Sequence, residues 1–475
     1  MKEHGKSSHK KNSKSCNSEN LLEYIIKGLS ASKKTSHKNE TIISSIIKET
    51  SKSNMKLNEK CLINTLNIDK QDIDQSIFKE KTSSNSPAIL EERKDDEYLK
   101  DKLIKLIKES FRTRGHYPQT TLDFYRLVKM IGKGAFGKVF LGVHLLTGKY
   151  VAVKSIEKKY IKEESSQKRI FQEVYILKKI NHQNVIRLLE VFENKRYLFL
   201  VLEYAPKGDL LKYVKKKTRL EEDVAKEIFA QIVSGLRHCH RNLILHRDVK
   251  LDNVLLDKNN KVKICDFGVS RFVKKGQTIK EQCGTPAYIA PEIIKDKGYE
   301  GCYADIWSLG VLLYAIVTGS VPFKADNIED LHKVILKGKY IIPNYVSESC
   351  KDLIRKMLQL NPYNRISIEA IGSHSWFDKG PEFGRRESMY DGQIRNSIFD
   401  GEHRRTHSMD KNCKKNTIAE VEPASVIRIL EPILQKVEGF GYSREFVIQS
   451  INSNSCNHAS VSYYLLYEEF QGEKC

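Results

Sequence analysis

Seven short motifs follow one another along this 475-residue chain, and their order and spacing constrain the fold more than any other feature. A glycine triplet alone would be weak evidence for a phosphate-binding turn, because glycine turns are common and most of them bind no phosphate. Chance does not readily place six further motifs downstream of it at mutually consistent distances. The motifs are Gly132-Lys133-Gly134-Ala135-Phe136-Gly137, Val151-Ala152-Val153-Lys154, Glu173, His246-Arg247-Asp248-Val249-Lys250-Leu251-Asp252-Asn253, Asp266-Phe267-Gly268, Ala290-Pro291-Glu292 and Arg365.

With these motifs, residues 125–377 resemble eukaryotic protein kinases of the serine/threonine type. The resemblance implies an α+β, bilobal fold, in which ATP is held in the cleft between the lobes. The N-lobe is an antiparallel sheet with one helix, αC, and the larger C-lobe is mostly helical. The local sequence agrees, because residues 125–156 read as three strands around the glycine-rich turn and a second turn at His144 to Lys149.

The predicted ATP site begins at the glycine-rich turn. Glycine is needed at positions 132, 134 and 137 because the backbone must approach phosphate oxygens closely, and its amides then become the donors. By the resemblance, Lys154 holds the α- and β-phosphates when the αC residue Glu173 orients it. The residues expected to contact ATP are Ile131, Gly132, Lys133, Gly134, Ala135, Phe136, Gly137, Lys138, Val139, Ala152, Lys154, the gatekeeper Leu202, and Glu203 and Ala205 of the hinge.

The catalytic loop and the Asp-Phe-Gly motif supply the predicted chemistry. Asp248 is the expected catalytic base, and Lys250 is the lysine with which serine/threonine kinases neutralise the γ-phosphate. Asn253 and Asp266 offer the hard oxygen ligands that Mg²⁺ requires when it is bound partly through ATP. None of these groups is missing, which favours an active enzyme using ATP and Mg²⁺ over a catalytically silent scaffold with the same fold.

Further positions carry roles that the resemblance implies. Leu177, Leu189, His246 and Phe267 match the apolar column that links αC to the Asp-Phe-Gly turn in active kinases. The αF residue Asp305 braces the catalytic loop, Arg365 pairs with Glu292, and Thr285 bridges the catalytic aspartate and lysine. Asp209 and Asp252 match the positions at which basophilic kinases hold an arginine three residues before the target, which predicts Arg-x-x-Ser/Thr substrates.

The activation segment departs from its relatives at one position. Similar kinases place a phosphorylated threonine two residues before the Cys283-Gly284-Thr285-Pro286 element, and here that position is Glu281. Its carboxylate is expected to pair with the positive charge of Arg247. This pairing is expected to give the kinase basal activity without phosphorylation of the activation segment. Thr278 is the alternative regulatory site, and a solvated glutamate with no role is the competing interpretation.

Outside residues 125–377 we expect four segments. Residues 1–92 form a basic extension rich in Lys, Ser and Asn and are predicted to be disordered, residues 93–124 a helix and linker, and residues 378–421 a basic flexible linker. Residues 422–470, with Gly439-Phe440-Gly441-Tyr442 and Asn457 to Leu466, resemble the ubiquitin-associated-like module of AMP-activated and microtubule-affinity-regulating kinases, in the CAMK-like group. The expectation is intramolecular regulation, with the module resting on the N-lobe and hinge side and restraining lobe closure. Ubiquitin binding and a calmodulin-binding tail are alternatives.

Composition bounds the partners and the compartment. The net charge of +21 could suggest nucleic acid or an anionic membrane, but the lysines are dispersed and no nucleic acid is expected. Ten cysteines without metal-ligand pairs and a polar start indicate neither a zinc module nor a signal peptide. The longest apolar stretches are too short for a transmembrane segment. An intracellular, cytoplasmic protein is predicted, and the N-terminal lysines leave nuclear entry open.

Overall fold

The computed structural model describes residues 88–134, 137–274, 277–295, 298–378 and 429–472. Most of the predicted disordered extension, nearly all of the predicted linker, the first residues of the C-terminal module, and Ala135 and Phe136 lie outside the described residues. The first described helix, α5 (Ala88–Arg114), contains the helix expected after residue 93. It begins earlier, within the segment predicted to be disordered.

The N-lobe is built on an antiparallel sheet with strand order β1-β2-β3-β5-β4. Its strands are β1 (Tyr125–Lys133), β2 (Gly137–His144), β3 (Lys149–Glu157), β4 (Leu188–Glu193) and β5 (Tyr197–Leu202). The β2–β3 turn ends at Gly148, whose φ of 68° glycine adopts without steric strain. A short helix, α6 (Lys158–Ile161), leads into α7 (Glu164–Lys179), the expected αC, which contacts β4.

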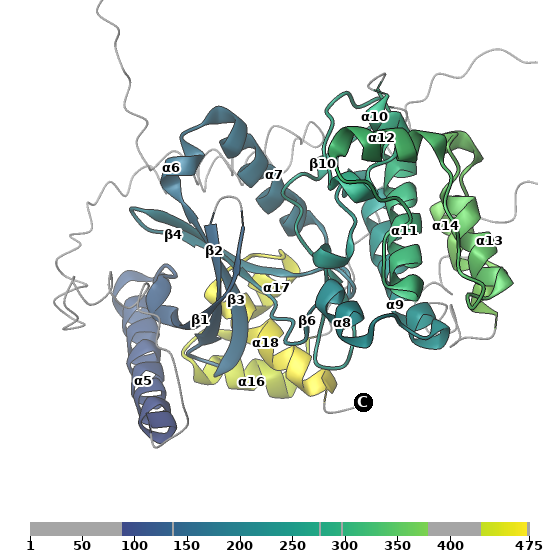
Figure 1. The fold of residues 1–475 in the computed structure, drawn as a ribbon. Coiled ribbons are helices and arrows are strands. Elements are labelled where there is room, and N and C mark those ends of the chain that lie inside the picture. The colour runs from purple at the N-terminus through teal and green to yellow at the C-terminus, as the bar shows by residue number, and fades with distance from the viewer. Residues whose placement is uncertain (1–87, 135–136, 275–276, 296–297, 379–428, 473–475) are drawn as a thin grey trace, which may run out of the picture. The chain divides into compact units, whose positions relative to one another are not determined.

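The C-lobe is mostly helical (Figure 1). Its helices are α8 (Leu210–Lys217), α9 (Glu222–Arg241), α10 (Pro291–Ile294), α11 (Gly301–Thr318), α12 (Ile328–Lys337), α13 (Glu348–Met357) and α14 (Ile368–Gly372). Two small sheets flank the predicted catalytic loop. One joins β6 (Gly208–Asp209), β8 (Val254–Leu256) and β9 (Val262–Ile264), and the other pairs β7 (Ile244–Leu245) with β10 (Arg271–Phe272).

Helix α11 is the core element of this lobe. Nearly all its residues are buried, and it contacts α9 and α13. Among the described residues it is the one helix long and apolar enough to cross a membrane, yet 83% of it is buried inside the protein. Its apolar length is therefore explained by its central position in the lobe.

Three helices at the C-terminus pack beneath the N-lobe sheet, near α5 (Figure 1). They are α16 (Glu431–Gly439), α17 (Arg444–Asn452) and α18 (His458–Gly472), and their positions follow the expected three-helix pattern. Helix α18 contacts β4 directly. Apolar residues of these helices, of the N-lobe and of α5 belong to one buried cluster. The three helices are called the C-terminal module below.

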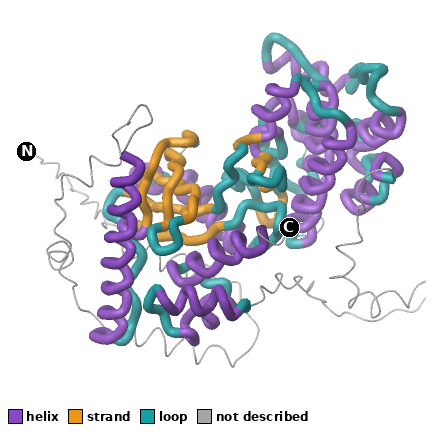
Figure 2. The backbone as a smooth tube through the Cα atoms, turned by 90° about the horizontal axis from the view of Figure 1, so that it is seen from below, coloured by secondary structure: helices purple, strands orange, loops and turns teal. Residues whose placement is uncertain are grey.

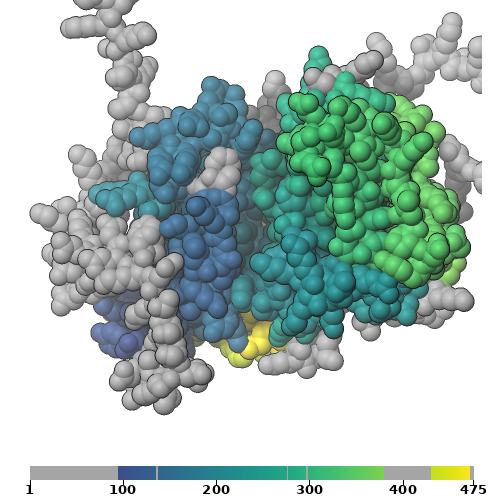
Figure 3. All heavy atoms as spheres, viewed as in Figure 1, coloured from purple at the N-terminus to yellow at the C-terminus, as the bar shows by residue number. Residues whose placement is uncertain are grey.

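The arrangement confirms the predicted bilobal α+β fold. Most strands gather in the N-lobe, whereas the C-lobe is built mainly of helices (Figure 2). The two lobes meet on the face shown in Figure 3, where N-lobe residues are blue and C-lobe residues run from teal to green. The predicted catalytic residues come from both sides of this boundary.

Candidate active site

The N-lobe supplies a closed ion pair. Lys154 lies in the central strand β3, and its Nζ is 2.6 Å from Oε1 of Glu173 on α7. Both side chains are largely shielded, with exposed fractions of 15% and 4%. Burial alone would lower the pKa of Lys154, but the charges of Glu173 and Asp266 raise it above its usual value. The ammonium therefore stays charged where phosphate would approach.

The four residues of the apolar column expected of an active kinase are all buried. Leu177 of α7 and Leu189 of β4 are buried, and so are His246 and Phe267 of the C-lobe. The rings of His246 and Phe267 meet edge to face, with centroids 5.0 Å apart. Helix α7, which carries Glu173, and the Asp-Phe-Gly turn, which carries Asp266, thus each contribute a buried residue to the predicted column.

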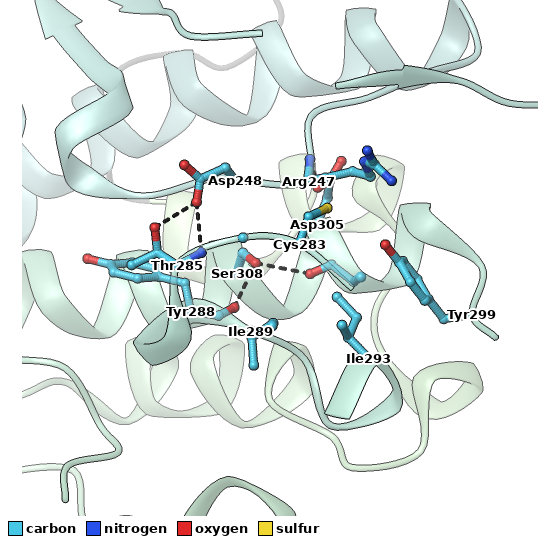
Figure 4. Close-up of a pocket in the computed structure, with 12 residues that line it drawn as sticks. Arg247, Asp248, Cys283, Thr285, Tyr288, Ile289, Ile293, Tyr299, Asp305 and Ser308 are labelled. Carbon is cyan, nitrogen blue, oxygen red and sulfur yellow. Dashed lines mark hydrogen bonds between the residues drawn. The ribbon is translucent and has the colours of Figure 1, made fainter. Parts of the chain in front are cut away.

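Asp248 is fixed by several donors (Figure 4). Its Oδ1 accepts hydrogen bonds from the backbone amide and the hydroxyl of Thr285, at 2.9 and 2.7 Å. Its Oδ2 lies 2.8 Å from Nζ of Lys250, which also donates to the Thr285 hydroxyl at 2.8 Å. Burial would raise the pKa of Asp248, but the bonds from Lys250 and Thr285 outweigh it and lower the pKa. The carboxylate is thus ionised and oriented.

The backbone around Asp248 is held from α11. Oδ1 of Asp305 accepts from the Arg247 amide at 2.8 Å, and Oδ2 accepts from the His246 amide at 3.0 Å. His240 of α9 lies 2.8 Å from the same Oδ2. The motif pattern did not identify His240, because a histidine in a helix carries no signal of its distant partner. Arg247 has a φ of +65°, an uncommon conformation for a side-chain-bearing residue, so this loop is strained as well as anchored.

The glycines of the turn serve two purposes. A Cβ on Gly137 would lie 1.8 Å from the carbonyl oxygen of Ser155, so strand packing alone requires glycine there. A Cβ on Gly132 or Gly134 would meet no atom closer than 3.7 Å. Their glycines are therefore not demanded by the protein's own packing, which fits the expected approach of phosphate oxygens. Ala135 and Phe136 lie outside the described residues.

The expected adenine side of the site is formed by adjacent strands. Ala152 of β3 pairs with Leu202 of β5, and both precede the hinge. Hinge residue Glu203 forms an ion pair with Lys263, and its backbone amide donates to the Arg187 carbonyl at 3.0 Å. Two residues that sequence reasoning did not single out therefore hold the predicted hinge residue: Lys263 by its side chain and Arg187 by its backbone carbonyl.

The two expected metal ligands lie at the start and the end of the β8–β9 hairpin. The side-chain amide of Asn253 donates to Asp248 at 2.9 and 3.0 Å, which leaves its carbonyl oxygen as the group suited to a cation. Asp266 has a φ of +64°. In the described residues, no group of three or more His, Cys, Asp or Glu could hold a metal ion unaided. Two oxygen donors fit a Mg²⁺ ion whose remaining ligands come from phosphate and water.

The two acids predicted to bind substrate come from neighbouring elements, because Asp209 ends β6, which pairs with β8, and Asp252 lies in the short turn just before β8. Asp209 caps α8 by accepting from the Lys212 amide at 2.8 Å, and its other oxygen lies 2.7 Å from Lys212 Nζ. The pKa of Lys212 is raised mainly by its hydrogen bond to Asp209, with a smaller contribution from Asp252. A cation already neighbours both acids, which agrees with a basic substrate side chain at this place.

The main ion-pair partner of Glu281 is Arg271 and not the expected Arg247. Its carboxylate receives two hydrogen bonds from Arg271, while Arg247 lies further away at 3.7 Å. Partial burial would raise the pKa of Glu281, but Arg271 and Arg247 lower it. Thr278 is exposed, and its methyl group would lie 2.6 Å from a Cβ on Gly298. Sequence reasoning missed Arg271, because its distance from Glu281 depends on the path of the activation segment.

The last two motifs meet in the C-lobe. The guanidinium of Arg365 donates to both carboxylate oxygens of Glu292, at 2.6 and 2.7 Å. A parallel pair of this kind is geometrically specific. It fixes the end of the activation segment relative to the body of the lobe.

Comparisons with known proteins agree with this geometry. The protein kinase domain family matches residues 125–377. Serine/threonine-protein kinase SIK2 of Gallus gallus is 35% identical over 350 residues, which cover 74% of this chain and 40% of that relative. Serine/threonine-protein kinase SIK1 of Mus musculus is 35% identical over 358 residues, which cover 75% of this chain and 42% of that relative.

The aligned region thus spans about two fifths of the length of these curated relatives. Within the present chain, however, the family match covers slightly more than half of the residues and contains every catalytic motif. The chain therefore belongs to the protein kinase family, and its catalytic domain is of the ATP- and Mg²⁺-dependent serine/threonine type, as its motifs predicted.

Proposed function

We propose that the whole protein transfers the γ-phosphoryl group of ATP to serine and threonine hydroxyls of other proteins. The observation that carries this proposal is the simultaneous presence of the closed Lys154–Glu173 pair and the oriented Asp248 carboxylate. A catalytically silent scaffold would need neither arrangement. When bound, Mg²⁺ supplies positive charge that offsets the charge of the phosphates.

The side chains divide the work of such a transfer. Asp248, ionised and held on Oδ1 by Thr285, accepts a hydrogen bond from the attacking hydroxyl and orients it. Lys250 lies 2.8 Å from the same carboxylate and places a positive charge beside the entering nucleophile. Lys154, positioned by Glu173, neutralises phosphate oxygens. Positioning and charge neutralisation are what phosphoryl transfer chiefly needs.

Replacing Asp248 by Asn removes the carboxylate charge and keeps the shape. We expect peptide phosphorylation to fall by about 10²- to 10⁴-fold, the range typical of a lost general base. Nucleotide affinity should change little, because Asp248 does not belong to the expected nucleotide contacts. Radiolabelled phosphate transfer and nucleotide titration measure the two quantities. Asp330→Asn, on the exposed start of α12, is the matched control. Equal transfer by both variants, or none by the unmodified protein, would favour the scaffold.

We further propose that substrates carry arginine three residues before the phosphorylated residue. Asp209 and Asp252 supply two carboxylates at one place on the cleft edge, and Lys212 shows that a cation fits beside them. Lys212 competes with a substrate arginine for Asp209. Because such an exposed pair is worth at most about 1 kcal/mol, an incoming bidentate arginine can displace it.

Asp209→Asn keeps the helix-capping oxygen of α8 but removes its charge. We expect it to reduce the preference for arginine over alanine at that substrate position by about fivefold, as expected for one partly exposed ion pair. Lys212→Ala removes the competitor and should keep or increase the preference. A peptide array run on all three proteins tests this, and acid-directed or proline-directed selection by the unmodified protein would contradict it.

We also propose that Glu281 gives the unphosphorylated enzyme basal activity. Its carboxylate pairs with Arg271 and lies 3.7 Å from Arg247, which adjoins the catalytic Asp248. A carboxylate at this place supplies part of the charge that a phosphate would carry, with fewer oxygens and less negative charge. Thr278 remains the alternative regulatory site in the same segment.

Glu281→Gln and Glu281→Ala are expected to lower the turnover of phosphatase-treated protein by about fivefold, since each removes one ion-paired charge worth about 1 kcal/mol. Glu348→Ala, at an exposed ion pair on α13, is the control and should leave turnover unchanged. Initial rates measured before any phosphorylation accumulates provide the comparison. Unchanged turnover in both Glu281 variants would show that this residue is a solvated loop glutamate without a role.

The C-terminal module is proposed to regulate catalysis through the N-lobe and hinge side. Tyr464 of α18 lies against the guanidinium of Arg187, 4.7 Å from the ring centroid, and Arg187 holds the hinge residue Glu203. The side chain of Asn454 donates to the carbonyl of Lys178 at the end of α7, at 3.3 Å. Leu189 belongs both to the apolar column and to the cluster that includes the module. These contacts coexist with a closed Lys154–Glu173 pair and favour support of catalysis over the expected restraint.

A chain ending at Ser408 lacks the module and is therefore expected to show a several-fold lower kcat, because α7 and the hinge lose packing on one side. Steady-state kinetics on the full and shortened chains test this. Tyr464→Ala should lower kcat in the same direction, whereas Tyr363→Ala, an exposed tyrosine of the C-lobe, should not. Unchanged kcat after truncation would contradict a regulatory role, and an increased kcat would establish restraint.

The setting of this enzyme is proposed to be intracellular. The six cysteines within the described residues are all free, which fits a reducing compartment. Cytoplasmic placement, nuclear entry and the expected absence of a nucleic-acid partner stay predictions from composition.

A further inference from the structure

The helix that precedes the catalytic domain shares its apolar core with the C-terminal module. Leu103 and Ile107 of α5 are buried in the same cluster as Leu434 and Val437 of α16 and Val447 of α17. The side chain of Ile107 is completely buried. No boundary separates a core of the module from a core of the N-lobe in this cluster. The module thus depends for its apolar packing on residues some 330 positions earlier in the chain.

The α16–α17 turn packs tightly against α5. Gly441 has a φ of +99°, and a Cβ there would lie 2.8 Å from Cγ of Lys108 and 3.3 Å from Ile107. Glycine is required both by the backbone conformation and by the contact with α5. The turn therefore fits closely against α5.

Tyr117, just beyond α5, extends the contact with polar and aromatic groups. Its hydroxyl accepts a hydrogen bond from the Ser443 amide at 2.6 Å, which satisfies a backbone donor at the start of α17. Its ring stacks on Phe111 of α5 at 4.7 Å and contacts Tyr442 and Phe446 of the module at 5.4 and 4.4 Å. One residue thus joins α5 to both sides of the turn.

Other bonds fasten α5 and the following segment to the N-lobe. Arg126 of β1 donates to both carboxylate oxygens of Asp96, at 2.7 and 2.8 Å. The carbonyl of Pro118 lies 2.7 Å from Nε2 of His458, at the start of α18. The ring of Phe124 stacks on the same histidine at 5.1 Å. The N-terminal segment is anchored on the lobe at one end and on the module at the other.

From these contacts we propose that α5 and residues 115–118 form a docking surface whose occupant is the chain's own α16–α17 turn. The module folds on this platform and is not an autonomous domain. A module of this size buries only a small core by itself, so packing on α5 adds a large part of its apolar contacts. While α5 is in place, the face of the module formed by Gly441, Tyr442 and Phe446 is occupied within the chain and is closed to an outside protein.

The test compares two apolar-to-acid substitutions on α5 in the full chain. Ile107→Asp places a charge on the buried face, whereas Tyr98→Asp changes a side chain that is 68% exposed. Amide hydrogen exchange in α16 and α17 should accelerate by about tenfold or more in Ile107→Asp and stay near the unmodified rate in Tyr98→Asp. Amides of the core helix α11 serve as the internal reference for an intact C-lobe.

Tyr117→Phe provides a milder second variant in case the buried charge disrupts the whole protein. It keeps the ring contacts and removes the hydrogen bond to Ser443, so exchange should accelerate at the start of α17 and not in α11. Unchanged exchange of α17 in Tyr117→Phe, or equal effects of Ile107→Asp and Tyr98→Asp on the module, would overturn the proposal. Neither readout requires catalytic activity, so the result is independent of the proposed function.

Discussion

A buried carboxylate on the central helix of the C-lobe holds the backbone of the predicted catalytic loop. Asp305 accepts hydrogen bonds from two successive backbone amides, and the ring of His240 lies within hydrogen-bond distance of the same carboxylate. Burial would raise the pKa of Asp305, but these bonds and the neighbouring histidines lower it. The ionised group holds His246 and the strained Arg247 in place, and Asp248 follows directly. An apolar residue at position 305 would leave both amides without their acceptor.

The N-lobe is organised by packing more than by charge. Leu189 of β4 belongs to the predicted apolar column and also lies in the buried cluster shared with α5 and the C-terminal module. Glu173 of the closed Lys154–Glu173 pair lies on α7, the same helix as Leu177 of the predicted column. Leu189 is therefore the residue at which the packing behind the sheet and the expected apolar column coincide.

The sequence motifs predicted the fold, which the structure confirms, because short strings of fixed spacing lie within single loops or adjacent strands. The catalytic roles that the same motifs assign stay predictions. Partners from distant segments could not be read in the same way. Arg271 as the main partner of Glu281, His240 beside Asp305 and Lys212 beside Asp209 depend on how whole elements pack. Gly137 illustrates a third case, since its glycine was predicted for phosphate approach, whereas contact with Ser155 also demands it. The early start of α5 escaped prediction because its first residues have no apolar periodicity.

The shared core behind the sheet sets where this protein can be cut. A fragment limited to residues 125–377 would keep every catalytic side chain and lose both α5 and the C-terminal module. Tyr125 and Phe192, now buried beneath those elements, would then face water beside the edge strand β4. Contiguous apolar surface next to an open strand promotes self-association. A fragment that keeps this apolar surface covered therefore includes chain from both sides of the catalytic domain.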